Sequence, residues 1–119
     1  MAFGEDMKKR IYPNKLVRDK IPSLILEQDH ECQSFILGDD ELVYALNKKM
    51  TEEMAELMEA HANPTVGQIL EELADVYEVV LGLSEALGYD LSVLEERARK
   101  KRQLRGGFTC GIWLNWFDS

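Results

Sequence analysis

Apolar residues recur every three or four positions along two long stretches of the chain, which is the spacing of an amphipathic helix. The first stretch follows Gly38 and is expected to end near residues 61–63. The second starts at Pro64, which suits the first turn of a helix, and is stopped by Gly88. The apolar positions are Val43, Leu46, Met50, Met54 and Leu57 in the first stretch and Ile69, Leu73, Val76, Val80, Leu83 and Leu87 in the second. A connection this short makes the two predicted helices antiparallel neighbours.

Shorter elements are predicted before this hairpin. Residues 1–11 are polar and without periodicity, and we expect them to form a flexible arm. Pro22 suits the first turn of a short helix that runs to about Asp29. Residues 33–37 are a short apolar run, which predicts a strand or an extended connector. One of the two aspartates at positions 39–40 is expected to cap the first long helix.

A further helix and a tail are predicted after the hairpin. The helix is capped by Asp90 or by Ser92, runs to about Leu104, and is ended by the glycine pair that starts at Gly106. Residues 108–117 are rich in aromatic and β-branched residues. They are expected to form an extended tail that docks elsewhere on the protein.

Length and composition fit a single domain over residues 1–119, and the helical spacing of its apolar residues predicts that this domain is all-α. An apolar content of 45% is enough for a folded core, which a disordered chain would lack. The two cysteines, Cys32 and Cys110, are too few for a disulfide framework or a cysteine zinc site. Because no signal-peptide pattern and no stretch of about 18 apolar residues occurs, we expect a cytoplasmic protein with no membrane partner.

Positive and negative charges occupy different parts of the chain. Residues 50–96 contain 12 acidic residues and no lysine or arginine, and all 14 basic residues lie outside this window. Separating the signs costs self-repulsion, which a cation bound among the acids and an anion bound by the bases would relieve. The alternative is that acidic helices simply keep the protein soluble. A net charge of −8 argues against nucleic-acid binding, because neutralising phosphates dominates that affinity.

Four acidic side chains are predicted to converge between the two long helices. Glu53 and Glu56 lie one turn apart on the first helix, as Glu72 and Asp75 do on the second. Glu53 and Asp75 are equally distant from Pro64 along the chain, and so are Glu56 and Glu72. A turn centred on that proline therefore places Glu53 opposite Asp75 and Glu56 opposite Glu72.

This carboxylate set has the composition of a metal site. Several of its members interrupt or flank the apolar stripes and are expected to be partly buried, and buried carboxylates stay charged together only around a cation. No lysine is expected within reach on either helix. Oxygen ligands alone suit Mg²⁺ or Mn²⁺, whereas zinc favours cysteine or histidine and a di-iron bundle needs two Glu-x-x-His pairs. The alternative is a set of ordinary surface acids.

The pattern Glu52-Glu53-x-x-Glu56, followed after 15 residues by Glu72-x-x-Asp75, resembles the signature of the MazG-type all-α nucleoside triphosphate pyrophosphohydrolases. Residues 14–22 and 105–108 resemble one branch of that superfamily, the phosphoribosyl-ATP pyrophosphohydrolase-like proteins. The resemblance covers residues 12–114, and all three stretches occur in the expected order.

The resemblance implies a helical fold that forms a bundle on dimerisation, with Mg²⁺-dependent cleavage between the α and β phosphates of a nucleotide. The metal ligands of the motif correspond to Glu53, Glu56, Glu72 and Asp75. The same resemblance gives Glu52 the role of orienting or deprotonating the attacking water.

The candidate substrate contacts are residues outside the acidic window, and two of them follow from the resemblance. Lys101 and Arg105, one turn apart, match the phosphate-facing pair of the family's last helix. Asn14 and Arg18 are candidate substrate contacts, and a structural role at the N-terminal turn is the alternative for both.

We therefore expect a hydrolase that converts a nucleoside triphosphate to the monophosphate and pyrophosphate, such as one that clears non-standard nucleotides. The first alternative is a phosphoribosyl-ATP pyrophosphohydrolase of histidine synthesis. The second is a non-catalytic helical dimer that acts as a binding or regulatory module. Val79, Leu83 and Leu87 are expected to need cover beyond one hairpin and a further helix, which predicts a homodimer or homotetramer.

Overall fold

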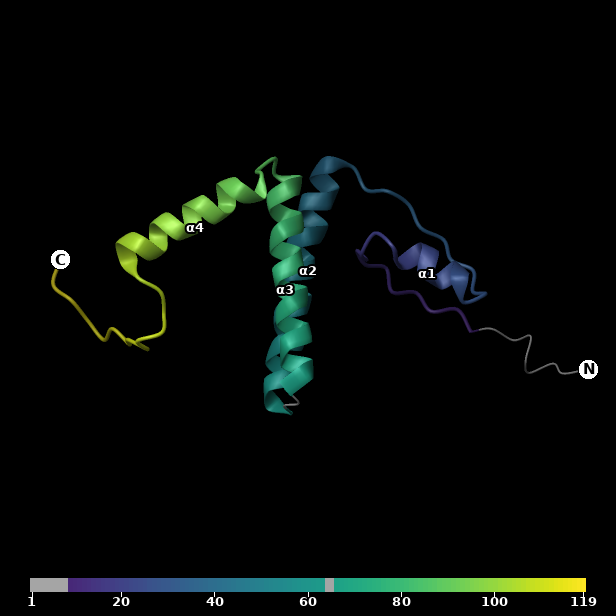
Figure 1. Ribbon diagram of the computed structural model, residues 1–119. Helices are drawn as coiled ribbons and strands as arrows, with labels where there is room; N and C mark the ends of the chain where they lie inside the picture. The colour runs from purple at the N-terminus through teal and green to yellow at the C-terminus, as the bar shows by residue number, and fades with distance from the viewer. Residues whose placement is uncertain (1–8, 64–65) are drawn as a thin grey trace, which may run out of the picture.

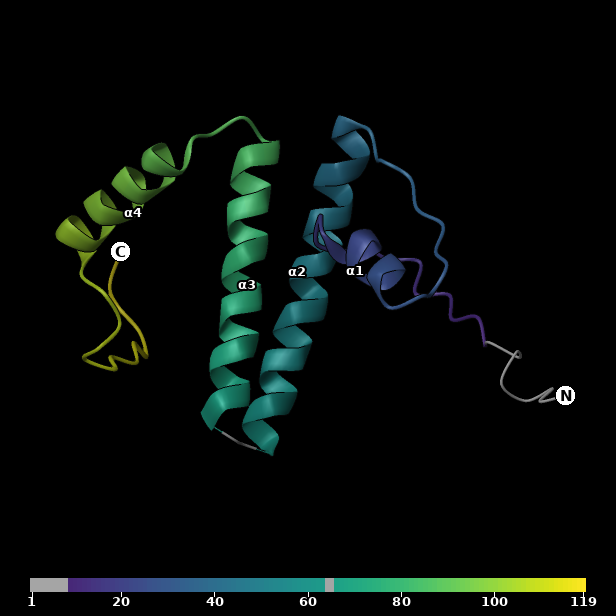
Figure 2. The same ribbon diagram turned by 45° about the vertical axis from the view of Figure 1, so that its right-hand side comes forward.

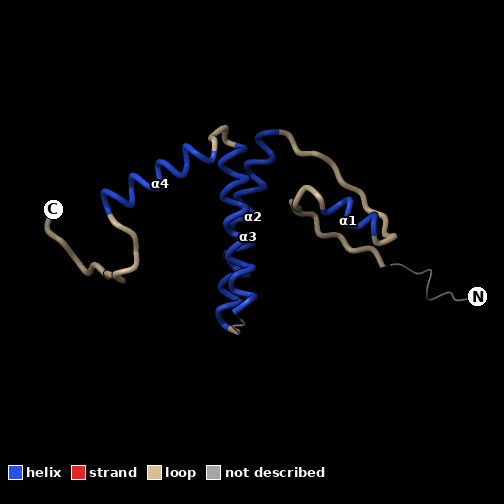
Figure 3. The backbone as a smooth tube through the Cα atoms, in the orientation of Figure 1, coloured by secondary structure: helices blue, strands red, loops and turns tan. Residues whose placement is uncertain are grey.

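A computed structural model describes residues 9–63 and 66–119, and these residues form four helices and no strand. The helices are α1 (Ile21–Glu27), α2 (Asp39–Ala62), α3 (Val66–Ala86) and α4 (Leu91–Arg105). Figure 1 shows the two long helices side by side at the centre, and Figure 3 shows loops on both flanks. The predicted all-α fold is confirmed. Most of the arm predicted over residues 1–11, and Pro64 itself, lie outside the described residues.

The α2–α3 hairpin is the packed part of the molecule (Figure 2). Among the side chains that the structure describes, three apolar ones are buried: Leu46 and Ala60 on α2 and Val79 on α3. Gly82 lets the helices approach closely, because a Cβ atom there would lie 3.3 Å from Cδ2 of Leu46. The antiparallel pairing predicted from the short connection between the two helices is therefore confirmed.

Glycines were predicted correctly at the carboxyl ends of the helices, whereas one of the predicted N-terminal caps was wrong. Gly88 and Gly106 have φ values of +85° and +83°, and glycine adopts positive φ values without the strain that a Cβ atom would cause. The N-cap of α2 is Gly38, so the prediction that an aspartate at 39–40 caps this helix was wrong. Those aspartates lie in the first turn, where their charge favours the helix dipole. The N-cap of α4 is Asp90, without a side-chain cap bond, and Ser92 lies inside the helix.

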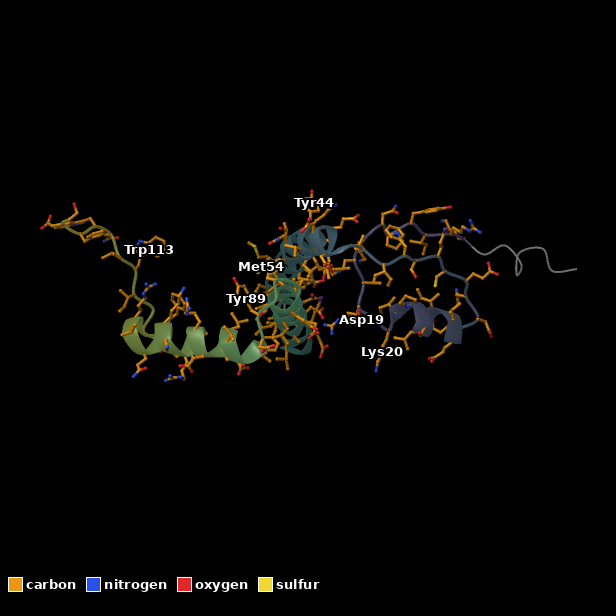
Figure 4. All side chains as sticks on the ribbon, turned by 90° about the horizontal axis from the view of Figure 1, so that it is seen from above. Asp19, Lys20, Tyr44, Met54, Tyr89 and Trp113 are labelled. Atoms are coloured by element: carbon orange, nitrogen blue, oxygen red, sulfur yellow. The ribbon has the colours of Figure 1, made fainter. Side chains whose placement is uncertain are left out.

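The flanking segments extend away from the hairpin instead of packing on it. Residues 33–37 form an extended connector, because no strand partner is present in the described chain. The prediction that residues 108–117 dock on the protein was wrong for a single copy: the Trp113 side chain is 87% exposed, and its neighbours are similarly open. Figure 4 shows Trp113 on one side of the hairpin and Lys20 on the other.

One copy of the chain has an unusually large surface. Its accessible area is 11347 Å², against about 6,600 Å² expected for a folded monomer of this mass. Its radius of gyration is 20.0 Å, against about 13.5 Å for a compact domain of this length. Val79, which was expected to need cover, is buried by the hairpin, whereas Leu83 is half-buried and Leu87 is exposed. Among the described residues, none of the helices has the length and apolar character that a membrane span requires.

Candidate metal centre

Three glutamates from the two long helices meet at the hairpin interface. Glu53 and Glu56 come from α2 and Glu72 comes from α3, and one carboxylate oxygen of each lies within 4.8 Å of the others. The i,i+3 spacing on α2 places its two acids on one face, and the antiparallel pairing brings the α3 acid opposite them. The predicted pairing of Glu56 with Glu72 is confirmed, and Glu53 joins them.

Two oxygens of this glutamate cluster are buried without any hydrogen-bond partner in the part of the chain that the structure describes. They are Oε2 of Glu53 and Oε2 of Glu72, and the Glu53 residue as a whole is only 6% exposed. A buried carboxylate oxygen without a partner is costly, and proteins usually satisfy it with a donor or a cation. The residues present therefore fit a divalent cation with hard oxygen ligands.

The predicted absence of a nearby lysine was wrong. Lys49 lies one turn before the acidic motif on α2, and its Nζ atom is 3.3 Å from Glu53 Oε1 and 3.6 Å from Glu52 Oε2. The acidic window, which contains no basic residue, begins at the next position, so Lys49 was counted as lying outside the site. The i,i+4 spacing from Lys49 to Glu53 was the signal that could have revealed it.

The environment of Glu53 opposes its ionisation. Burial raises its pKa above the ordinary value of 4.5, and the charge of Glu56 raises it further, while the bond from Lys49 lowers it in part. Charged Glu53 therefore destabilises the metal-free fold. A divalent cation would offset this cost by favouring the charged form.

The fourth predicted ligand, Asp75, is not a member of the glutamate cluster. Its Oδ1 atom accepts a hydrogen bond of 2.6 Å from a guanidinium nitrogen of Arg18, which lies in the segment before α1. Gly82 lies against Leu46, which agrees with the helix register predicted for Asp75 and Glu53. The carboxylate of Asp75 is nevertheless bound to Arg18 and not to the glutamate cluster. The structure thus brings one of the predicted substrate residues, Arg18, to one of the predicted metal ligands.

The remaining predicted residues lie outside the glutamate cluster. Glu52 is its sequence neighbour and contacts Lys49. Asn14 has a positive φ of 46° and its side chain donates to the carbonyl of Tyr12, which fits a turn. Lys101 and Arg105 lie on α4, which extends away from the hairpin (Figure 1), so one copy does not bring them to the glutamates.

An open hollow of about 470 Å³ adjoins the cluster toward the α2–α3 turn. Glu56 and Glu72 contribute to its wall, together with Glu59, Ala60, Asn63 and Gln68. The sequence analysis did not single out Asn63 or Gln68 as site residues. Carboxylate ligands at the edge of an open hollow leave room for a second molecule beside a bound cation.

An all-helical chain that gathers glutamates on a pair of antiparallel helices has the architecture of the MazG-like all-α nucleoside triphosphate pyrophosphohydrolases. The model of the phosphoribosyl-ATP pyrophosphohydrolase family matches residues 22–102, and the chain belongs to this family. The matched range includes all three clustered glutamates and excludes Arg18. Neither the comparison with curated proteins nor that with solved structures gives a match.

The raised pKa of Glu53 leads to a stability prediction. Because the folded-state pKa lies above the ordinary 4.5, protonation of Glu53 should make a stabilising contribution to the metal-free fold as the pH falls from neutral toward 4.5. Glu53→Gln should raise the melting temperature of the metal-free protein at pH 7, and the difference from wild type should shrink toward pH 4.5. Thermal melts in a chelating buffer measure both effects.

Glu78→Gln is the matched control for this prediction. Glu78 is exposed on α3, and its substitution removes the same unit charge. An equal rise in the two variants would assign the effect to net charge and not to burial. A lower melting temperature for Glu53→Gln at pH 7 would contradict the account of its environment.

Proposed function

We propose that the protein is a Mg²⁺-dependent nucleotide pyrophosphohydrolase, with Mn²⁺ as a substitute ion, that releases pyrophosphate from a nucleoside triphosphate. The observation that carries the proposal is the glutamate cluster with two buried, unpartnered oxygens in a chain of this family. Glu53, Glu56 and Glu72 would hold the ion. A hard divalent cation suits this all-oxygen set.

The bound ion would supply charge neutralisation for the triphosphate and a lower pKa for a water molecule. Hydrolysis then requires that water attack the α phosphorus while the bond to the bridging oxygen breaks. The products are the nucleoside monophosphate and pyrophosphate. We assign proton acceptance from that water to Glu52, which neighbours the glutamate cluster and keeps part of its side chain in solvent.

Two substrate classes are compatible with this chemistry. A nucleoside triphosphate, including non-standard ones, is our first assignment. The matched family is named for phosphoribosyl-ATP, which favours that nucleotide as the second. A non-catalytic binding module is less well supported, because the three clustered acids of the motif are present and none is replaced.

Within one copy, Lys49 and Arg18 are paired with carboxylates in and beside the cluster, and the two basic residues predicted to face the phosphates lie away from it on α4. We propose that a second copy supplies the phosphate contacts through Lys101 and Arg105 of its α4, within a homodimer or homotetramer. The large surface of one copy and its exposed aromatic tail support association. An arginine binds phosphate oxygens through two parallel bonds, which suits Arg105 to the role.

Product analysis tests the proposed function. With Mg²⁺, a panel of nucleoside triphosphates and phosphoribosyl-ATP should yield monophosphate and pyrophosphate in equal amounts for at least one member. Glu53→Gln should lower turnover by about 100-fold or more, because an amide replaces a charged ligand. Chromatography of the nucleotide products measures both.

The charge-matched Glu78→Gln variant should keep the wild-type rate. Release of a nucleoside diphosphate and inorganic phosphate would place cleavage between the β and γ phosphates and contradict the proposal. Absence of turnover with every member of the panel would favour the binding module.

Co-expression of two inactive variants tests whether a second copy completes the site. Arg105→Ala should lower kcat/KM by about 100-fold, as the loss of a transition-state donor does elsewhere. When Arg105→Ala is co-expressed with Glu53→Gln, the sample should recover about a quarter of wild-type activity. Half of randomly formed dimers contain one copy of each variant, and one of the two sites in such a dimer is intact. Steady-state rates on the purified mixture provide the measurement.

The control pair is Glu53→Gln with Glu72→Gln, whose defects both fall in the glutamate cluster and should not complement each other. No recovery in the Arg105→Ala mixture would place the basic residues in the same copy as the acids, or outside the site altogether.

A further inference from the structure

Arg18 and Asp75 form an ion pair between distant parts of the chain. A guanidinium nitrogen of Arg18 lies 2.6 Å from Asp75 Oδ1, and the two residues are 57 positions apart. The pair is open to solvent, with side-chain exposures of 58% for Arg18 and 38% for Asp75. An interaction at this distance and in this environment is directional but can be exchanged for another partner.

The pair coincides with the separation of Asp75 from the glutamates. Asp75 lies one turn after Glu72 on the same helix, so it can reach the neighbourhood of the glutamate cluster. Its oxygens are nevertheless not among the mutually close ligand atoms, and one of them is bound to Arg18. In this structure the guanidinium neutralises the carboxylate that a cation at the cluster would attract.

The segment that carries Arg18 is weakly attached to the rest of the protein. Within the described chain, α1 packs against none of the other helices. In Figure 1 α1 stands apart from the hairpin, and the Arg18–Asp75 pair connects the segment before α1 to α3. The carbonyl of Arg18 also accepts a backbone hydrogen bond from Ile21 at the start of α1. Arg18 is therefore hydrogen-bonded directly to the first residue of α1.

We propose that Arg18 is a displaceable counter-ion of Asp75, so that a divalent cation and Arg18 compete for this carboxylate. Cation binding draws Asp75 into the glutamate cluster, frees Arg18, and releases the segment before α2 from the hairpin. The proposal rests on the proposed metal-dependent function. It adds an order of events, in which the guanidinium becomes available to an anionic substrate only after the metal site is filled.

The competing arrangement makes the opposite prediction. An arginine that merely orients a metal-bound carboxylate would strengthen metal binding, because outer hydrogen bonds hold ligands in place. Under competition, Arg18→Gln removes the rival and strengthens binding. Because an exposed ion pair contributes little free energy, loss of the Arg18–Asp75 pair should change the affinity for the divalent cation by about two- to fivefold.

Calorimetric titration of the full-length protein with MnCl₂ distinguishes the two. Arg18→Gln should bind Mn²⁺ about two- to fivefold more tightly than wild type. Lys15→Gln is the matched control, because it removes the same charge from the same segment. In Asp75→Asn the Arg18→Gln substitution should have no further effect, since the carboxylate for which the two cations compete is gone.

Hydrogen–deuterium exchange provides the second readout, independent of activity and of charge. Adding Mn²⁺ to wild type should speed exchange of the amides of residues 18–27, which include α1, and Asp75→Asn should show the fast exchange without any metal.

Unchanged or slower exchange on Mn²⁺ binding would overturn the proposal while leaving the metal site intact. Equal or weaker Mn²⁺ affinity in Arg18→Gln, or equal gains in the Lys15 control, would overturn it as well. Failure of Mn²⁺ to bind any of these proteins would overturn the metal site and the Arg18 proposal together.

Discussion

The burial of a carboxylate between two helices is the constraint on which the rest of this structure depends. Glu53 occupies a position on α2 where helix packing would favour an apolar residue, and it faces Glu56 and Glu72. The hairpin has few buried apolar side chains to offset that cost. A fold that keeps acids at its best-packed interface sacrifices stability there, and a cation bound between the helices is the physical compensation that the ligand set suits.

The chain already supplies partial compensation through two of its own cations. Lys49 contacts Glu53 from within α2, and Arg18 contacts Asp75 from a distant segment. Neither reaches the buried Oε2 atoms of Glu53 and Glu72. The metal-free protein is thus neutralised at the edges of the acidic set and left unsatisfied at its centre. Burial of Glu53, together with the charge of Glu56, keeps its pKa raised in spite of its lysine.

Much of this arrangement was predictable because it is local or symmetric. Periodicity predicted the two long helices, and equal distances from Pro64 predicted that Glu56 meets Glu72. The same argument placed Asp75 in the set, but its carboxylate is held by Arg18 instead. The Arg18–Asp75 pair could not be predicted, since it joins residues 57 positions apart and no periodic pattern links them. The aromatic tail was wrongly expected to dock, because its composition indicates a buried surface but not which chain provides it. Four proposed roles remain predictions, because they depend on a substrate or on a second copy of the chain. They are those of Glu52, Asn14, Lys101 and Arg105.

The central claim is that the glutamate cluster is a cation site, and the most direct measurement is the melting temperature of the wild-type protein as a function of Mg²⁺ or Mn²⁺ concentration. A ligand that binds only the folded state stabilises it by about 2.7 kcal/mol at 100 times its dissociation constant, which raises the melting temperature by several degrees. We expect this rise in wild type and its loss in Glu72→Gln, whose amide cannot replace the buried carboxylate. A melting temperature that responds to neither ion, or that rises equally in Glu72→Gln, would contradict the account.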